Sequence, residues 1–244
     1  MARLQDKVII ITGGAQGMGE THARLCLQHG AKVVLTDINS EKGEALAKEL
    51  GDNALFIKQD VTNQEDWDKV VKQTTATFGQ IDVLVNNAGI TTNTSILQTS
   101  VEDYRKILEI NQVSVFLGMK AVIPSMKAAK QGSIINISSI NGLVGGAIGY
   151  TDSKFAVRGM TKAAALECAA YGIRVNSIHP GVIATPMIMQ SDTKDAVEAF
   201  AKTIPMKRVA QPEEVSGMVL FLASDDSSYS TGAEFVVDGG LTAQ

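Results

Sequence analysis

Short apolar runs alternate with longer amphipathic segments along the whole chain of 244 residues. The short runs are rich in Val and Ile and bounded by Gly, Asp or Asn, so we expect buried β-strands there. These strands are expected at 7–12, 32–37, 54–60, 82–89, 133–139, 174–181 and 234–240. The segments between them follow helical spacing, and helices are expected at 17–29, 40–51, 62–78, from 100 or 102 to 126, 151–170 and 212–223.

This alternation predicts one doubly wound α/β domain over residues 1–244. Its centre is a parallel sheet of about seven strands with helices on both faces. Two helix starts are predicted in detail. Ser40 is expected to be an N-cap, and Thr62 is expected to be another, with Glu65 completing a capping box. Residues 184–210, rich in Met and Pro, are expected to form a lid over a substrate.

Composition and charge narrow the possible functions. Hydrophobic residues make up 45% of the chain and charged residues 20%, and the formal net charge is −4. Without a basic stripe, we expect no nucleic-acid partner. The apolar runs are too short for a signal peptide or a membrane span, so a cytoplasmic protein is expected. Cys26 and Cys168 lie in helical segments and are expected to be buried free thiols, with no spacing for a metal site.

The glycine-rich turn after the first strand predicts a dinucleotide site. Gly13, Gly17 and Gly19 follow the pattern Gly-x-x-x-Gly-x-Gly, with Gln16 and Met18 between them. Glycines let the backbone approach a pyrophosphate, and a helix N-terminus offers free N–H groups and a favourable dipole. Such turns also serve ordinary strand-to-helix packing, but the position between a strand and a helix favours the cofactor.

Acidic and amide side chains end the next three strands. Asp37 ends the second strand, where a carboxylate accepts hydrogen bonds from ribose hydroxyls and repels a 2′-phosphate. We therefore expect NAD rather than NADP, although Asp37 is also suited to capping the following turn. Open sheets bind ligands at the carboxyl ends of their strands, which adds the following residues to the expected cofactor site. They are Asp60, Val61, Asn87, Ala88 and Gly89.

Tyr150 and Lys154 are four residues apart at the start of a predicted helix, on one of its faces. A nearby ammonium and a helix N-terminus both favour the phenolate, so we expect the pKa of Tyr150 to fall below its usual value of about 10. Alone, the pair is typical of a protein surface. However, Ser139 ends the fifth strand at the same sheet edge. Asn111 lies in an apolar helical segment, where we expect a buried role such as holding a water beside Lys154.

Together these motifs resemble the short-chain dehydrogenase/reductase family over nearly the full chain. The matching segments are TGGAQGMG (12–19), DV (60–61), NNAG (86–89), Asn111, NISS (136–139), YTDSK (150–154), PG (180–181) and VDGG (237–240). The resemblance implies Tyr150 as general acid/base, Lys154 as its pKa tuner and ribose contact, Ser139 as substrate-orienting donor and Asn111 in a proton relay. It also implies a homotetramer, and a segment closing over the nicotinamide that includes Pro180, Gly181, Ile183 and Thr185.

Two features depart from the family pattern. The loop from Ser139 to Tyr150 is about two residues shorter than is common, and Asp152 replaces the usual small apolar residue of the Tyr-Lys motif. The loop is expected to line the substrate site, so the substrate of a relative does not transfer directly to this chain.

The favoured hypothesis is an NAD-dependent carbonyl reductase or secondary alcohol dehydrogenase with an apolar pocket. A 3-oxoacyl-carrier-protein reductase or a hydroxysteroid dehydrogenase is the alternative; Asp37 and the missing basic docking patch weaken the first of these. A dinucleotide-binding sensor is a third hypothesis, and the complete catalytic set argues against it. The expected pocket residues are Ile90, Leu143, Val144, Gly145, Gly146, Met187, Ile188, Met189, Phe200 and Met206.

Overall fold

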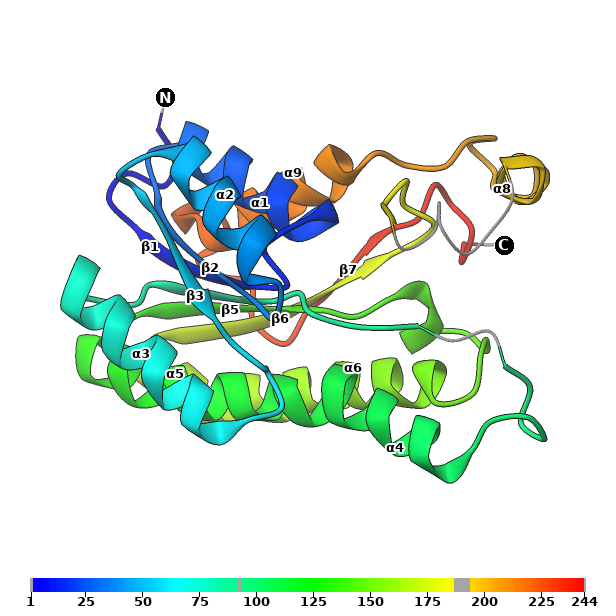
Figure 1. Cartoon of the computed structure of the whole chain (residues 1–244), viewed down its shortest axis with the longest axis horizontal. Coiled ribbons are helices and arrows are strands. Elements are labelled where there is room, and N and C mark those ends of the chain that lie inside the picture. Colours follow the sequence, from blue (N-terminus) through cyan, green and yellow to red (C-terminus); the bar gives the residue numbers. More distant parts are fainter. Residues whose placement is uncertain (1, 92–93, 187–193, 244) are drawn as a thin grey trace.

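The computed structural model describes residues 2–91, 94–186 and 194–243. Within them, seven strands form one parallel sheet in the order β3-β2-β1-β4-β5-β6-β7 (Figure 1). The strands are β1 (Val8–Thr12), β2 (Lys32–Asp37), β3 (Ala54–Lys58), β4 (Val83–Asn86), β5 (Gly132–Ile137), β6 (Ile173–Pro180) and β7 (Glu234–Val237). The order reverses between β1 and β4, which confirms the doubly wound fold and opens a crevice at the carboxyl ends of the strands.

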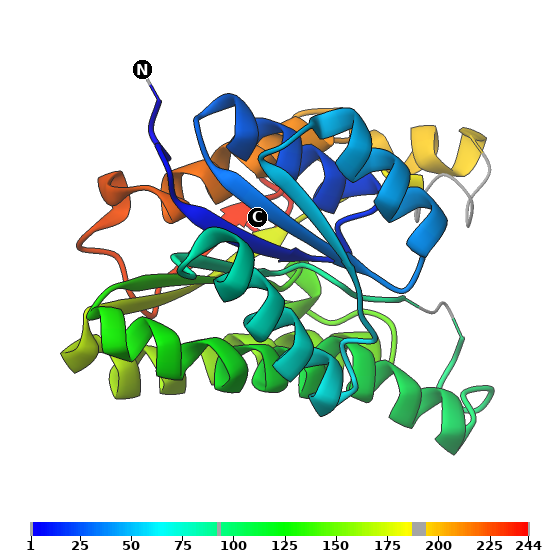
Figure 2. The same cartoon turned by 60° about the vertical axis from the view of Figure 1, so that its left-hand side comes forward.

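Helices cover both faces of the sheet (Figures 1 and 2). One layer consists of α1 (Gly17–Gln28), α2 (Ser40–Leu50) and α9 (Pro212–Ala223). The other consists of α3 (Gln64–Phe78), α4 (Val101–Leu108), α5 (Ser114–Ala129) and α6 (Tyr150–Cys168). Helix α8 (Lys194–Ala201) lies away from both layers, and short 3₁₀ turns occupy Ile140–Gly142, Ala169–Tyr171 and Asp225–Ser227.

Each face of the sheet has its own apolar core. Along β1, Ile9 and Ile11 pack with α1 and α9, whereas Ile10 packs on the other side with residues of α3 and α5. Side chains alternate between the faces of a strand, so a strand covered on both sides must be apolar throughout. This explains why the strands appear in the sequence as continuous apolar runs.

Both predicted helix caps are wrong by one residue: Ser40 lies one residue too late and Thr62 one residue too early. Asn39, not Ser40, caps α2, because its side-chain oxygen accepts a hydrogen bond from the N–H of Lys42 at 3.1 Å. Asn63 caps α3 in the same way, with the N–H of Glu65 at 2.8 Å. Thr62 instead donates to the preceding acid. Asn caps a helix as well as Ser or Thr does. The sequence alone therefore does not distinguish two neighbouring residues that are both suited to the N-cap position.

The long helix expected to end at Met126 is interrupted. A π turn at Glu109–Val113 separates α4 from α5, and α5 continues through Pro124 to Ala129. A π turn inserts one extra residue into the helix and is frequent at functional sites. Here it contains Asn111, which is completely buried.

The helical run Val101–Ala129 is long and apolar enough to cross a membrane by length and composition, with a mean hydropathy of 1.3. The expectation that no segment reaches this length was therefore wrong. Its apolar residues Val115, Met119, Val122 and Met126 pack beneath the sheet in the second core. Packing within the domain thus accounts for the hydrophobicity of this run.

A buried histidine joins helices α1 and α9 of the first layer. His22 of α1 is completely buried, and its Nδ1 lies 2.7 Å from the hydroxyl of Ser216 in α9. Burial lowers the pKa of His22 from 6.5 to about 3. The folded protein therefore holds this imidazole neutral at pH values where the unfolded chain binds a proton.

We expect the free energy of unfolding to fall as the pH drops below about 6.5, since only the unfolded state is protonated there. The loss from His22 is about 1.4 kcal/mol per pH unit. Urea unfolding at pH 7 and pH 5 measures it, with His22→Leu as the variant that lacks the titrating group. The variant should lose about 2 kcal/mol less than the wild type between these two pH values. Equal losses would show that His22 does not titrate in this way.

Candidate active site

The glycine-rich turn joins β1 to α1 at the crevice. Gly13 and Gly17 have φ angles of 62° and 60°, which favour glycine. A Cβ on Gly19 would lie 2.2 Å from the carbonyl oxygen of Gly13, so the turn is too tight for any side chain there. Gln16 is the N-cap residue of α1 and makes no side-chain cap hydrogen bond. The first N–H groups of α1 are therefore suited to an anion at this turn.

Asp37 lies beside this turn at the end of β2. Its carboxylate accepts hydrogen bonds from the N–H groups of Ala15 (3.2 Å) and Asn39 (3.0 Å), so it joins the turn to the start of α2. Asp37 thus also caps the turn that follows β2, which was the alternative role predicted from the sequence. The Asp60 carboxylate is also hydrogen-bonded within the protein, because it accepts two hydrogen bonds from Thr62 at 2.9 and 2.7 Å. Val61 is buried next to it.

Asn87 fastens the end of β4 to the glycine-rich turn. Its side-chain nitrogen donates to the carbonyl oxygens of Thr12 (2.9 Å) and Gly13 (3.2 Å). The hydroxyl of Thr12 accepts from the N–H groups of Asn87 and Ala88, both at 3.0 Å. The other side-chain atom, Oδ1 of Asn87, is buried and has no hydrogen-bond partner in the described structure. An acceptor left in this state at a crevice points to a ligand donor.

Asn111 uses its amide to hold the loop after β4. Its oxygen accepts from the N–H of Ile90 at 2.8 Å, and its nitrogen donates to the carbonyl of Ile90 (2.8 Å) and to the hydroxyl of Ser153 (3.3 Å). Both amide hydrogens are thus used within the protein, and the expected role of holding a water beside Lys154 stays a prediction. A Cβ on Gly89 would lie 3.2 Å from the Asn111 oxygen and 3.7 Å from Nζ of Lys154. The two polar atoms therefore face the same space.

Tyr150 and Lys154 are brought together at the first turn of α6, as the spacing predicted. Nζ of Lys154 lies 5.6 Å from the centre of the Tyr150 ring and donates to the carbonyl of Ile137 at 2.9 Å. Burial lowers the pKa of Lys154 from 10.5 to about 8. Burial also raises the pKa of Tyr150, and a hydrogen bond to the Ser139 side chain opposes this. The expected lowering of the Tyr150 pKa by Lys154 is not found, because desolvation of the phenol is the largest effect and only the Ser139 hydrogen bond opposes it.

Ser139 faces Tyr150 and Ser138 faces away, in agreement with the two-residue period of a strand. The Ser139 hydroxyl accepts from the N–H of Asn141 at 3.1 Å and hydrogen-bonds the phenol. The Ser138 hydroxyl donates to the carbonyl of Lys154 at 3.0 Å and so fixes α6 against β5. Asp152 accepts from the N–H of Gly149 at 2.6 Å, which holds the residue before Tyr150.

The segment after β6 crosses the glycine-rich turn. Gly181 donates its N–H to the carbonyl of Val237 at 2.9 Å, and Ile183 is buried. A Cβ on Gly17 would lie 3.9 Å from Cβ of Thr185. Thr185 thus lies beside the glycine-rich turn, and the closing of Pro180, Gly181, Ile183 and Thr185 over the nicotinamide stays a prediction.

Residues 13–242 match the family described as enoyl-(acyl carrier protein) reductase. The chain is also similar to 3-alpha-(or 20-beta)-hydroxysteroid dehydrogenase of Mycobacterium tuberculosis, with 50% identity over 99% of this chain and 91% of the relative. The chain belongs to the short-chain dehydrogenase/reductase family. The sequence resemblance and the assignment as an oxidoreductase acting on CH–OH groups are confirmed.

Other members of the short-chain dehydrogenase/reductase family are similar over their full length. Cyclopentanol dehydrogenase of Comamonas sp. is 49% identical, covering 100% of both chains. NADP-dependent (R)-specific alcohol dehydrogenase of Lentilactobacillus kefiri is 42% identical over 99% of both. The crystal structure of levodione reductase superposes with a TM-score of 0.94, at 34% identity and 99% coverage of both chains. Since one of these relatives is named as NADP-dependent, family membership does not decide between NAD and NADP for this chain.

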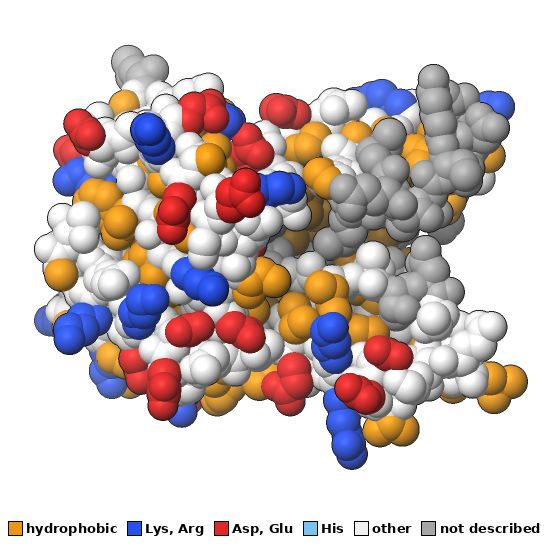
Figure 3. All heavy atoms as spheres, in the orientation of Figure 1, with side chains coloured by type: hydrophobic (Ala, Val, Ile, Leu, Met, Phe, Trp, Pro, Cys, Tyr) orange, Lys and Arg blue, Asp and Glu red, His pale blue; other side chains and the backbone are white. Residues whose placement is uncertain are grey.

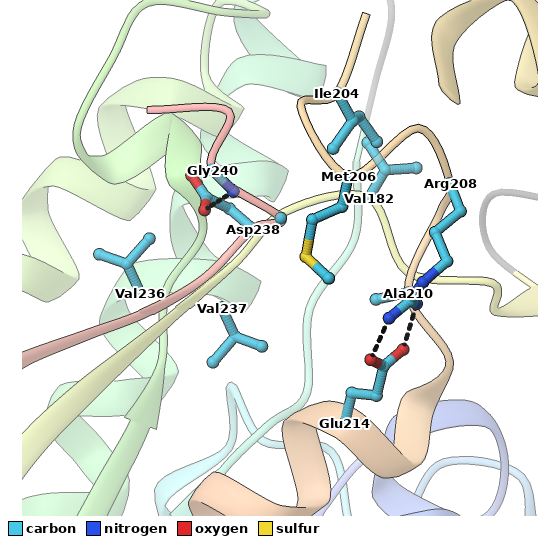
Figure 4. A pocket seen from close by; sticks show the side chains of 11 residues that line it. Val182, Ile204, Met206, Arg208, Ala210, Glu214, Val236, Val237, Asp238 and Gly240 are labelled. Carbon is cyan, nitrogen blue, oxygen red and sulfur yellow. Dashed lines mark hydrogen bonds and ion pairs between the residues drawn. The ribbon is translucent and has the colours of Figure 1, made fainter. Parts of the chain in front are cut away.

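In the space-filling view, hydrophobic side chains gather around a hollow between the two helical layers (Figure 3). Of the expected lid residues, Met187, Ile188 and Met189 lie outside the described residues. Met206 lines a different cavity of about 290 Å³ at the ends of β6 and β7 (Figure 4). Val182, Ile204, Val236 and Val237 are its apolar walls, and none of the four predicted catalytic residues borders it. Met206 therefore does not join the expected substrate pocket here.

Three residues that support the site were not selected from the sequence as site residues. Thr12 and Ser153 tie the motifs together through the hydrogen bonds above. His179 contacts Ser139 from β6. Each lies next to a selected motif in the sequence, but their roles depend on which segments meet across the sheet.

Proposed function

We propose that this protein is an NAD-dependent dehydrogenase of secondary alcohols, working also as a ketone reductase. The observation that carries the proposal is the group formed by buried Ser139, half-buried Tyr150 and buried Lys154 at the same sheet edge as the glycine-rich turn. Dinucleotide binding alone does not require a phenol hydrogen-bonded to a serine beside an ammonium. Proton exchange with a substrate oxygen does.

The residues at the turn fit a nicotinamide dinucleotide. The uncapped start of α1 suits the pyrophosphate, and the unpaired Oδ1 of Asn87 suits a donor of the bound cofactor. Asp37 favours NAD, because its carboxylate lies where a 2′-phosphate would be repelled. When bound, the cofactor supplies or accepts the hydride.

Residues of the chain orient the substrate oxygen and transfer its proton. Ser139 orients that oxygen with its hydroxyl, and Tyr150 donates the proton in reduction and accepts it in oxidation. The raised pKa of Tyr150 keeps the phenol protonated and ready to donate. Lys154, whose pKa is about 8, is largely charged at neutral pH and stabilises the phenolate that remains.

We propose apolar, ring-containing alcohols and ketones as substrates. One relative is named for hydroxysteroids and another for cyclopentanol. Asp37 and the acidic net charge of −4 weigh against an acidic carrier protein as the substrate carrier. The short loop between Ser139 and Tyr150 would set the size of ring accepted.

Initial rates with NADH test this function directly. The panel contains cyclopentanone, a 3-ketosteroid and an acetoacetyl thioester, each measured with NADH and with NADPH. We expect turnover of the cyclic ketones with NADH. Tight selectivity for the thioester would instead favour a carrier-protein reductase. NADH binding without turnover of any carbonyl would favour a sensor.

We further propose a homotetramer. Phe116 on α5 and Phe155 and Leu166 on α6 are exposed in the single chain, with Leu166 exposed to 85%. Large apolar side chains on two long neighbouring helices are suited to contacts with a second copy. Light scattering of the purified protein measures the assembly, and a monomer at micromolar concentration would contradict the proposal.

A further inference from the structure

The hydrogen bonding between β5 and β6 ends just before the catalytic serine. The N–H of Ser138 donates to the carbonyl of Ile178 at 2.8 Å. Pro180 has no N–H with which β6 could continue the pairing. The carbonyl of Ser139 is bonded by a side chain, because Nδ1 of His179 lies 2.9 Å from it.

The partners of His179 determine its tautomer. A carbonyl oxygen only accepts, so the proton of the neutral ring must be on Nδ1. Nε2 then accepts from the hydroxyl of Ser177, whose oxygen is 2.9 Å away. The ring is completely buried, and burial lowers the pKa of His179 and so favours this neutral form. Both ring nitrogens are therefore satisfied inside the sheet.

Charged groups near the ring have hydrogen-bond or ion-pair partners other than the ring. Glu234 of β7 makes ion pairs with Arg158 (2.9 Å) and Lys162 (2.7 Å) of α6. Lys154 donates to the carbonyl of Ile137. None of these groups is among the hydrogen-bond partners of the imidazole, so its strongest contacts are the two neutral ones. His179 therefore joins two strand ends rather than forming a charge pair.

The Ser139 peptide links this histidine to the chemistry. Ser139 has an extended backbone, with φ −167°, and its side chain hydrogen-bonds the Tyr150 phenol. The carbonyl carbon is bonded to the Cα that carries this side chain, so a hydrogen bond that holds the carbonyl limits where the side chain lies. We propose that His179 is a positioning residue, whose Nδ1–H fixes the Ser139 peptide so that the serine hydroxyl faces Tyr150. This inference rests on the proposed function, because it assigns the geometry of the same catalytic group.

Three variants test this role. His179→Leu removes the donor while nearly keeping the volume. His179→Asn keeps a side-chain N–H close to the position of Nδ1. His22→Leu is the matched control, since His22 is another completely buried histidine that contacts a serine hydroxyl, but it lies away from Ser139. Thermal melting verifies that each variant is folded.

We expect His179→Leu to lower kcat about 30-fold or more, as removal of a well-placed hydrogen bond at a catalytic group does. The Kd for NADH should stay within about two-fold. His179→Asn should recover most of the lost kcat, and His22→Leu should leave kcat within about two-fold of the wild type. A purely structural role predicts that Asn and Leu at position 179 impair kcat equally, and that result would overturn the inference. Unchanged kcat in folded His179→Leu would overturn it too.

A second measurement does not depend on turnover. Nitrogen-15 NMR of the three histidines reports the ring tautomers, and the His179 signals are those absent from His179→Asn. We expect the neutral Nδ1–H form for His179. An inactive wild-type protein with this tautomer would refute the proposed function alone. An active enzyme with the Nε2–H tautomer would refute the inference alone, including the case in which His179→Leu does not fold.

Discussion

Replacing Tyr150 by Phe is expected to lower kcat about 1,000-fold while leaving the Kd for NADH within about three-fold. A positioned general acid contributes typically 10²–10⁴ to the rate, and phenylalanine keeps the ring but removes the proton. The ring packs at the first turn of α6, so the fold should remain intact. Steady-state rates and NADH fluorescence titration separate the two effects.

Tyr171→Phe is the control for this experiment. It removes the same hydroxyl from the 3₁₀ turn Ala169–Tyr171 that follows α6, where Tyr171 contacts Lys127 rather than the crevice. We expect wild-type rates from it. If Tyr150→Phe retained wild-type turnover, the acid/base role of Tyr150 would be excluded.

Asp37 should control the choice of cofactor, the second large effect. We expect the wild type to prefer NADH over NADPH by about 100-fold or more in kcat/KM, because placing a 2′-phosphate beside a carboxylate costs several kcal/mol. Asp37→Ala removes that repulsion and also the acceptor for the ribose hydroxyls. The preference should then shrink to within about ten-fold of unity, mainly through KM.

Glu41→Ala is the matched control for charge. Glu41 is an exposed acid in the first turn of α2, and its loss changes the net charge equally. It should leave the cofactor ratio unchanged. A wild-type preference for NADPH, or a ratio that Asp37→Ala does not move, would contradict the assignment of NAD.

The strands were predictable from sequence because burial on both faces makes each one continuously apolar. The glycine-rich turn, Asp37 and Tyr150 were found for a related reason. Each is recognised from a short stretch of sequence, and residues at the carboxyl ends of parallel strands lie close together at one edge of the sheet. The ends of helices were less certain, since Asn39 and Ser40 are adjacent and both are good caps.

Other features depend on contacts that no local pattern contains. The π turn at Asn111 follows from the hydrogen bonds of its amide with Ile90, a residue 21 positions earlier in the chain. The raised pKa of Tyr150 depends on how much of the ring is buried, which spacing to Lys154 does not reveal. His179 reaches Ser139 only because β6 lies beside β5.

The two separate cores of the domain have a consequence for how such an enzyme can diverge. The turn and Asp37 rest on the core beneath α1 and α9, whereas Tyr150 and Lys154 belong to a helix packed on the other. Since the cores share only the sheet, a mutation that loosens one is largely insulated from the other. Mutations can therefore change the preference for NAD or NADP during evolution without disturbing the proton transfer. The two halves of the domain can accumulate substitutions independently of each other.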